Sequence, residues 1–156
     1  MEGLLAGLEA TAVAQTLRAS RWLYAATNAA HVLGIALLVG AIVPLDLRLL
    51  GRWRHVDRTA LVRVLVPVAA SGLTLAMVTG GLLFSVRARE YSGIGVLQLK
   101  LALVVAGALC ALALHRVHGF LLESASDSRL AGHAALSLLC WPAVLLCGRL
   151  IAFAGN

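Results

Sequence analysis

The sequence predicts an all-α membrane protein, an up-down-up-down bundle of four transmembrane helices, from three observations. Hydrophobic residues make up 61% of the 156 residues and charged residues only 13%, far more apolar than a water-soluble domain of this size needs. Four segments each hold the roughly 20 mainly apolar residues that a spanning helix requires. Short connections join these segments, so consecutive helices run antiparallel. Residues 1–156 thus form one domain, with helices expected at about 22–45, 63–86, 94–118 and 133–154.

The N-terminal segment before the first spanning helix is expected to form a short amphipathic helix on the membrane surface. Leu4, Leu5, Leu8 and Ala12 recur there at helical spacing. The segment carries glutamates and no basic residue before its first apolar stretch, which is unlike a cleavable signal peptide. We therefore expect the first spanning helix to act as an uncleaved signal-anchor.

The net charge of +6 predicts membrane topology rather than a nucleic-acid partner. The basic residues stand at helix ends and in short loops, not on one soluble face. The segment from Arg48 to Arg63 alone holds five arginines, and dense charge in a short early loop favours the cytoplasmic side. We expect a multi-pass protein of the bacterial inner membrane, with both termini in the periplasm.

His31 is the first candidate site residue, because an ionisable side chain inside a membrane helix is costly and is usually functional. It follows Trp22 by nine residues, which places it roughly 13 Å below the outer boundary. Helix alternation brings Met77, Lys100 and Arg149 to the same outer half. These residues suit a haem b, with His31 as axial ligand, Met77 as the second ligand, and the two cations at the propionates.

Each of these residues also has a simpler interpretation. His31 can form a hydrogen bond between two helices, and Met77 can fill an irregular part of the core. Lys100 and Arg149 can extend their charged ends to the lipid headgroups.

The other four histidines gather at the inner boundary. His115 and His118 are three residues apart and share a helical face, with His133 across a short loop and His55 in the first loop. The first three suit a transition metal or a second haem, although loop histidines are commonly just solvated. His31 lies too far away to pair with His115, which excludes the simplest two-histidine haem.

Cysteines and acidic residues give weaker signals. Cys110, Cys140 and Cys147 fall within the predicted helices and are expected to be packing residues, although Cys110 and Cys140 lie at similar depth and suit a metal or redox pair. Asp46 is expected to pair with an arginine or to cap the next element. The second helix holds no further acid between Asp57 and Glu90, which argues against a proton-coupled transporter.

Small residues that repeat every four positions predict where helices approach closely, because the hydrophobic effect does not drive association within lipid. Two helices carry such rows. They are Gly72, Ala76 and Gly80 on the second helix, and Ala102, Ala106 and Cys110 on the third.

Several stretches resemble a family of small bacterial four-helix membrane proteins of unknown function. They are LLAGLEATAVAQTLRASRWLY, NAAHVLGIALLVGAIVPLDLRLLG, LQLKLALVVAGA with a following HR, and CGRLIAF. The most specific piece is H-x-L-G-x-A-L-L-x-G followed by D-L-R-L-L-G. More distantly, the first helix is similar to copper-resistance-D-type and cytochrome-b-type bundles, but the other helices lack the paired deep histidines of di-haem members. The resemblance implies that His31, Asp46, Arg48, Lys100 and Arg149 are positions of interest.

The sequence as a whole favours an inner-membrane protein that binds haem b and takes part in electron transfer. A non-catalytic accessory subunit of a larger membrane complex is the alternative, and a copper-handling or small-solute protein using His31, Met77 and the cysteines is the third. No nucleophile-base pair, phosphate loop or catalytic carboxylate pair is evident, so an electron carrier or accessory subunit is favoured over an enzyme. Beyond the lipid bilayer, a redox partner, a larger complex and a homo-oligomer all stay open as partners.

Overall fold

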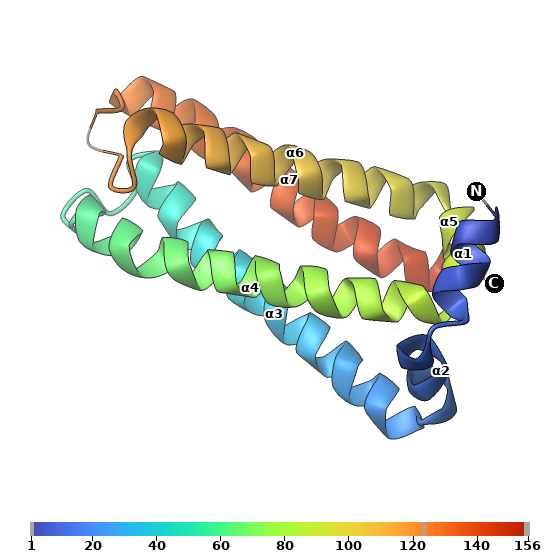
Figure 1. Ribbon diagram of the computed structural model, residues 1–156. Coiled ribbons are helices and arrows are strands. Elements are labelled where there is room, and N and C mark those ends of the chain that lie inside the picture. The colour runs from blue at the N-terminus through green and yellow to red at the C-terminus, as the bar shows by residue number, and fades with distance from the viewer. Residues whose placement is uncertain (1, 123, 155–156) are drawn as a thin grey trace.

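The computed structural model describes residues 2–122 and 124–154, and the fold within them is all-α, as predicted (Figure 1). No strand occurs in this part of the chain. Its helices are α1 (Glu2–Glu9), α2 (Ala12–Ala19), α3 (Arg21–Leu49), α4 (Arg58–Val86), α5 (Ala88–Ser92), α6 (Gly95–His118) and α7 (Asp127–Ala154).

Four of these helices, α3, α4, α6 and α7, are long and apolar enough to cross a membrane. They alternate in direction, and both chain termini lie at the same end of the molecule (Figure 1). We call this the terminal end, which corresponds to the outer side expected from the sequence. The opposite end carries the α3–α4 and α6–α7 loops and is called the loop end.

The long helices extend beyond the predicted apolar segments at the loop end. α3 continues to Leu49, α4 begins at Arg58, and α7 begins at Asp127. Asp57 explains the early start of α4, since its carboxylate accepts hydrogen bonds from the backbone N–H groups of Thr59 at 3.2 Å and Ala60 at 2.9 Å. Polar first turns of this kind lie outside any apolar window, so hydropathy alone places the helix ends too far inside.

The N-terminal segment forms two short helices instead of the single predicted one. Thr11 interrupts them, because its hydroxyl donates to Leu8 O at 2.8 Å and accepts from the Ala14 N–H at 3.3 Å, capping α2. α2 then packs against α4 through Ala14 and Leu17, which are buried. The segment is therefore attached to the bundle at the terminal end.

Glu9 anchors α1 to α5 at the terminal end. The Arg89 backbone N–H donates to Glu9 Oε1 at 2.9 Å, and the Arg89 guanidinium donates to Oε2, also at 2.9 Å. The Glu9 side chain is only 11% exposed. A carboxylate that accepts both a backbone and a charged donor holds two short helices together.

Glu9→Gln is expected to loosen this attachment and to speed hydrogen exchange at the Arg89 amide severalfold. The Arg89 backbone hydrogen bond, followed by its side-chain hydrogen bond, lowers the pKa of Glu9 below its ordinary value of 4.5. The contact therefore stabilises the attached state fully above about pH 4.5, and this stabilisation is lost as the pH falls through the lowered pKa. Exchange measured at pH 7 and below pH 4 checks the sign. Glu2→Gln on the same helix is the control and should leave exchange at Arg89 unchanged.

The four long helices form two hairpins, α3–α4 and α6–α7, which meet mainly at the loop end. α3 packs along α4 and also against α7, whereas in the described residues no Cα atom of α4 lies within 8 Å of one in α6. Toward the terminal end, α3 diverges from α6 and α7 (Figure 1). The buried cluster that joins the hairpins comprises Leu45, Val62, Leu114, Leu122, Ala125 and Leu130.

Two glycines set the crossing of α3 and α4. A Cβ on Gly34 would lie 2.7 Å from Ala76 N, and a Cβ on Gly72 would lie 2.6 Å from Leu38 N, so only glycine permits this backbone approach. The predicted close contact through Gly72 and Ala76 is confirmed.

The close contact between α6 and α7 is made by Gly107 rather than by the row predicted on α6. Ala102 and Ala106 of that row are exposed, whereas a Cβ on Gly107 would lie 3.2 Å from both Cys140 Sγ and Trp141 Cζ2. The prediction that the row on α6 makes the close approach was therefore wrong. A row of small residues does not by itself show which side of a helix meets its neighbour.

The outward surface of the long helices is apolar, as expected for contact with a lipid bilayer. Leucines and valines with more than half of their surface exposed occur on all four helices. Examples are Val32, Val64, Leu109 and Leu139, which are 57%, 61%, 59% and 73% exposed.

Candidate functional site

His31 forms a hydrogen bond between α3 and α4. Its Nδ1 lies 2.9 Å from Ala76 O and 3.1 Å from Thr79 Oγ1. A carbonyl oxygen can only accept, so this network assigns the proton to Nδ1. The helix-to-helix hydrogen bond that was one interpretation of His31 is therefore present.

The other ring nitrogen of His31 keeps its acceptor character. In the described residues both hydrogen bonds of the ring are made by Nδ1, which leaves a lone pair on Nε2 in the neutral imidazole. Gly80 provides the space for the ring, since a Cβ there would lie 3.0 Å from His31 Cε1. A histidine held in this way matches the arrangement of metal-binding histidines, which donate their second N–H to a carbonyl or carboxylate.

Lys100 is the charged group that the structure brings near His31. It is partly buried on α6, and its positive charge acts electrostatically on the His31 ring. Its Nζ lies beside the α7 backbone, where a Cβ on Gly148 would be 3.2 Å away. Lys100 thus reaches His31 electrostatically from the opposite hairpin, and the predicted site that joins the two residues stays a prediction.

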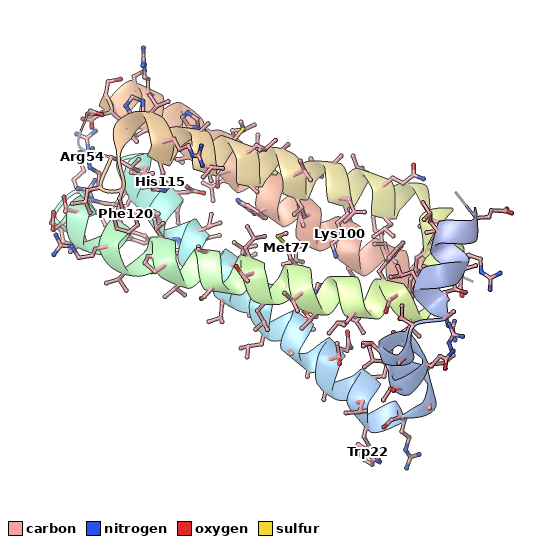
Figure 2. All side chains as sticks on the ribbon, in the orientation of Figure 1. Trp22, Arg54, Met77, Lys100, His115 and Phe120 are labelled. Carbon is pink, nitrogen blue, oxygen red and sulfur yellow. The ribbon has the colours of Figure 1, made fainter. Side chains whose placement is uncertain are left out.

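Met77 and Arg149, the other two predicted haem residues, lie on α4 and α7. The Met77 side chain is 59% exposed, and Figure 2 shows Met77 and Lys100 in the interval between the two hairpins. Arg149 is exposed. Their roles at a haem stay predictions.

The histidines predicted as a metal site lie at the loop end. His115 and His133 line one cleft, while His118 Nδ1 is 3.2 Å from the Ser124 hydroxyl. The His115 ring lies 6.1 Å from the Phe120 ring, and Figure 2 shows both at the loop end. Among the described residues, no group of three or more His, Cys, Asp or Glu side chains could hold a metal ion.

The cleft that contains His115 and His133 lies between the two hairpins and has a volume of about 550 Å³. All four long helices contribute to its walls, which are mainly apolar. A few polar side chains interrupt these walls, a composition typical of small-molecule sites. They are Asp46, Ser137, His115 and His133, together with the thiols of Cys110 and Cys140.

Asp46 is the most constrained of these polar groups. It is 6% exposed, and the Ser137 side chain on α7 lies near enough to its carboxyl to interact with it. Its second oxygen, Oδ2, is buried and has no hydrogen-bond partner in the described part of the chain. Neither predicted role holds, because Arg48 donates instead to Val56 O at 2.7 Å and α4 is capped by Asp57.

His115 carries a second buried atom of the same kind. Its Nδ1 likewise finds no hydrogen-bond partner among the described residues. Asp46 lies on α3 and His115 on α6, two helices whose backbones do not approach each other closely. Each helix thus contributes a residue with an unsatisfied polar atom to the same cleft. The sequence alone missed this pairing because the predicted first helix ended at residue 45, which put Asp46 at a boundary. The signal was available in Leu45 and Leu49, which continue the helical period across Asp46.

The three cysteines behave as packing residues in the described structure. All are free thiols, and Cys147 is buried. Cys140 donates its thiol hydrogen to Leu103 O at 3.3 Å, which links α7 to α6 next to the cleft.

The chain matches no protein-family model, no curated protein and no solved structure. The resemblance to a four-helix family of unknown function therefore stays a prediction. The structure offers two groups of residues for function: His31 with Lys100 toward the terminal end, and the cleft with Asp46 and His115 toward the loop end.

Proposed function

We propose that this chain is a bacterial inner-membrane protein that binds haem b between its two hairpins and takes part in electron transfer. His31 is the axial ligand, through Nε2. The observation that carries this proposal is the hydrogen bond from His31 Nδ1 to Ala76 O at 2.9 Å. It fixes the tautomer and the ring direction that iron ligation requires.

The surroundings of His31 suit the rest of a haem. The Lys100 ammonium acts on the ring from the opposite hairpin and can pair with a propionate. Arg149 lies near the end of α7 and supplies a second cation at the same end of the bundle. Met77 on α4 offers a thioether as the second axial ligand.

The packing of the helices leaves a way to admit a planar group. In the described part of the chain the backbones of α4 and α6 stay more than 8 Å apart, so a planar group between them does not have to separate two closely packed helices. The bound haem supplies one-electron redox chemistry. The protein residues hold the ring, pair with its carboxylates and exclude water from it.

His31→Ala is expected to reduce the haem bound per protein at least tenfold, because it removes the proposed ligand whose orientation is fixed by hydrogen bonds to Ala76 and Thr79. The measurement is the Soret absorbance of protein purified in mild detergent, normalised to protein. His55→Ala in the α3–α4 loop is the matched control and should retain the full band. Size-exclusion chromatography of both variants shows whether the fold is kept.

Two outcomes contradict the proposal. A colourless wild-type protein, expressed with haem supplied, would mean that His31 serves only as the hydrogen bond between α3 and α4. An unchanged Soret band in folded His31→Ala would remove His31 from the site. Lys100→Gln should weaken haem retention less than His31→Ala, because it removes a partner of the propionates rather than a bond to iron.

A further inference from the structure

We propose that the cleft between the hairpins binds a lipophilic hydroquinone, with one hydroxyl group at Asp46 and the other at His115. The site lies toward the loop end and involves none of the residues assigned to the haem. It therefore goes beyond the proposed function and stands or falls separately.

Buried polar atoms without partners are the first reason. Nearly all buried polar groups in folded proteins are hydrogen-bonded, since leaving one unsatisfied is destabilising. Asp46 Oδ2 and His115 Nδ1 are both buried and unpartnered in the described structure, and both residues line the same cleft. A ligand that fills the cleft removes this cost when the two side chains turn toward it and bond to it.

The chemistry of the two atoms selects hydroxyl groups. Asp46 Oδ2 accepts a hydrogen bond when the carboxyl is ionised and can donate one when it is protonated, and His115 Nδ1 accepts or donates according to its tautomer. A hydroxyl both donates and accepts, so it satisfies either atom in either state. A ketone oxygen can only accept a hydrogen bond and an ammonium group can only donate one, so each satisfies only one protonation state of these atoms. Two such atoms on separate helices call for two hydroxyl groups on one molecule.

The walls of the cleft select a lipophilic molecule with a flat polar head. The volume of about 550 Å³ is in the range of small-molecule sites. Trp141, only 4% exposed, contributes its indole to the wall, and aromatic rings pack favourably against one another. An aromatic diol therefore fits this environment better than an aliphatic one.

The route into the cleft runs from the bilayer. Ala70 on α4 and Ala106 on α6 both line the cleft and are both exposed. The backbones of α4 and α6 do not approach each other closely. The cleft therefore opens between these two helices onto the apolar surface. An alkyl tail on the ligand can remain in lipid while the aromatic head lies inside.

Photolabelling with an alkyl hydroquinone that carries a diazirine on its tail tests this proposal, with the protein in lipid nanodiscs and labelled peptides mapped by mass spectrometry. We expect labelling of cleft residues such as Leu73 and Leu103, which are partly buried. Decylhydroquinone should compete for it about tenfold better than its dimethyl ether, which keeps the ring and the tail but has no hydroxyl hydrogen.

Variants separate this site from the haem and from general partitioning into lipid. Asp46→Leu and His115→Phe should each weaken competition by decylhydroquinone about tenfold. His115→Phe keeps an aromatic ring beside Phe120, so it still tests the site if Asp46→Leu does not fold. His31→Ala should leave labelling unchanged. The proposal would be overturned if lipid-facing Leu150 and the cleft residues were labelled equally, and if decylhydroquinone, its dimethyl ether and the two variants all gave the same labelling.

Discussion

Gly72→Ala is expected to lower the free energy of unfolding by about 3 kcal/mol, because it inserts a methyl group where two helix backbones meet. The new Cβ would lie 2.6 Å from Leu38 N and 2.7 Å from Gly34 O. Both contacts are with backbone atoms, so no side-chain rotation relieves them. The two helices must separate, and the loss of contact spreads along the longest interface of the fold.

Gly81→Ala on the same helix is the matched control. Nothing lies within 4 Å of a Cβ built there, and alanine is the better helix former by up to about 1 kcal/mol. Unfolding of each variant in mixed micelles, followed by circular dichroism as the denaturing detergent increases, gives the comparison. Equal midpoints for Gly72→Ala and Gly81→Ala would mean that α3 and α4 do not cross as described.

Separation of α3 and α4 should also affect His31. Its hydrogen bond to Ala76 O lies near the glycine crossing, since the Cβ on Gly34 would contact Ala76 itself. The haem binding proposed above is therefore expected to weaken in Gly72→Ala together with the helix contact. The same residues thus serve packing and the orientation of the candidate ligand.

The fold could be predicted from the sequence because membrane helices are determined mainly by length and apolar composition. The crossing at Gly72 was also predictable, because small residues must occupy any close approach in lipid. The α6–α7 contact was not. Gly107 shares its side of the helix with Lys100, seven residues earlier, whose Nζ lies beside Gly148 of α7. A search for small residues at a spacing of four does not use that polar marker.

The candidate site could be predicted only in part, for a related reason. Counting residues from the helix ends gives depth, which predicts that His31 and Lys100 lie in the same half of the bundle. Depth does not show how the two hairpins pack together. The wide backbone separation of α4 and α6, and the cleft between them, could therefore not be predicted. Asp46 was given the wrong role because the first helix was predicted to end at residue 45, whereas α3 runs four residues further, to Leu49.

Asp46→Leu is expected to raise the free energy of unfolding by about 1–3 kcal/mol in ligand-free protein. Asp46 is 6% exposed and one of its oxygens has no hydrogen-bond partner among the described residues. Folding therefore removes the carboxyl from water without replacing all of its hydrogen bonds. Leucine removes that cost and packs against the apolar wall. The Ser137 hydroxyl can then bond to the carbonyl one turn earlier in α7, so no polar atom is stranded.

Asp57→Ala should shift stability in the opposite direction, which makes it the matched control. Asp57 caps α4 through hydrogen bonds to two backbone N–H groups, and loss of a helix cap costs about 1 kcal/mol. The same micelle unfolding experiment measures both variants. A destabilised Asp46→Leu protein would show that the carboxyl serves the fold. A stabilised one would show that the chain keeps a costly group at the cleft, the pattern typical of a residue retained for binding rather than for stability.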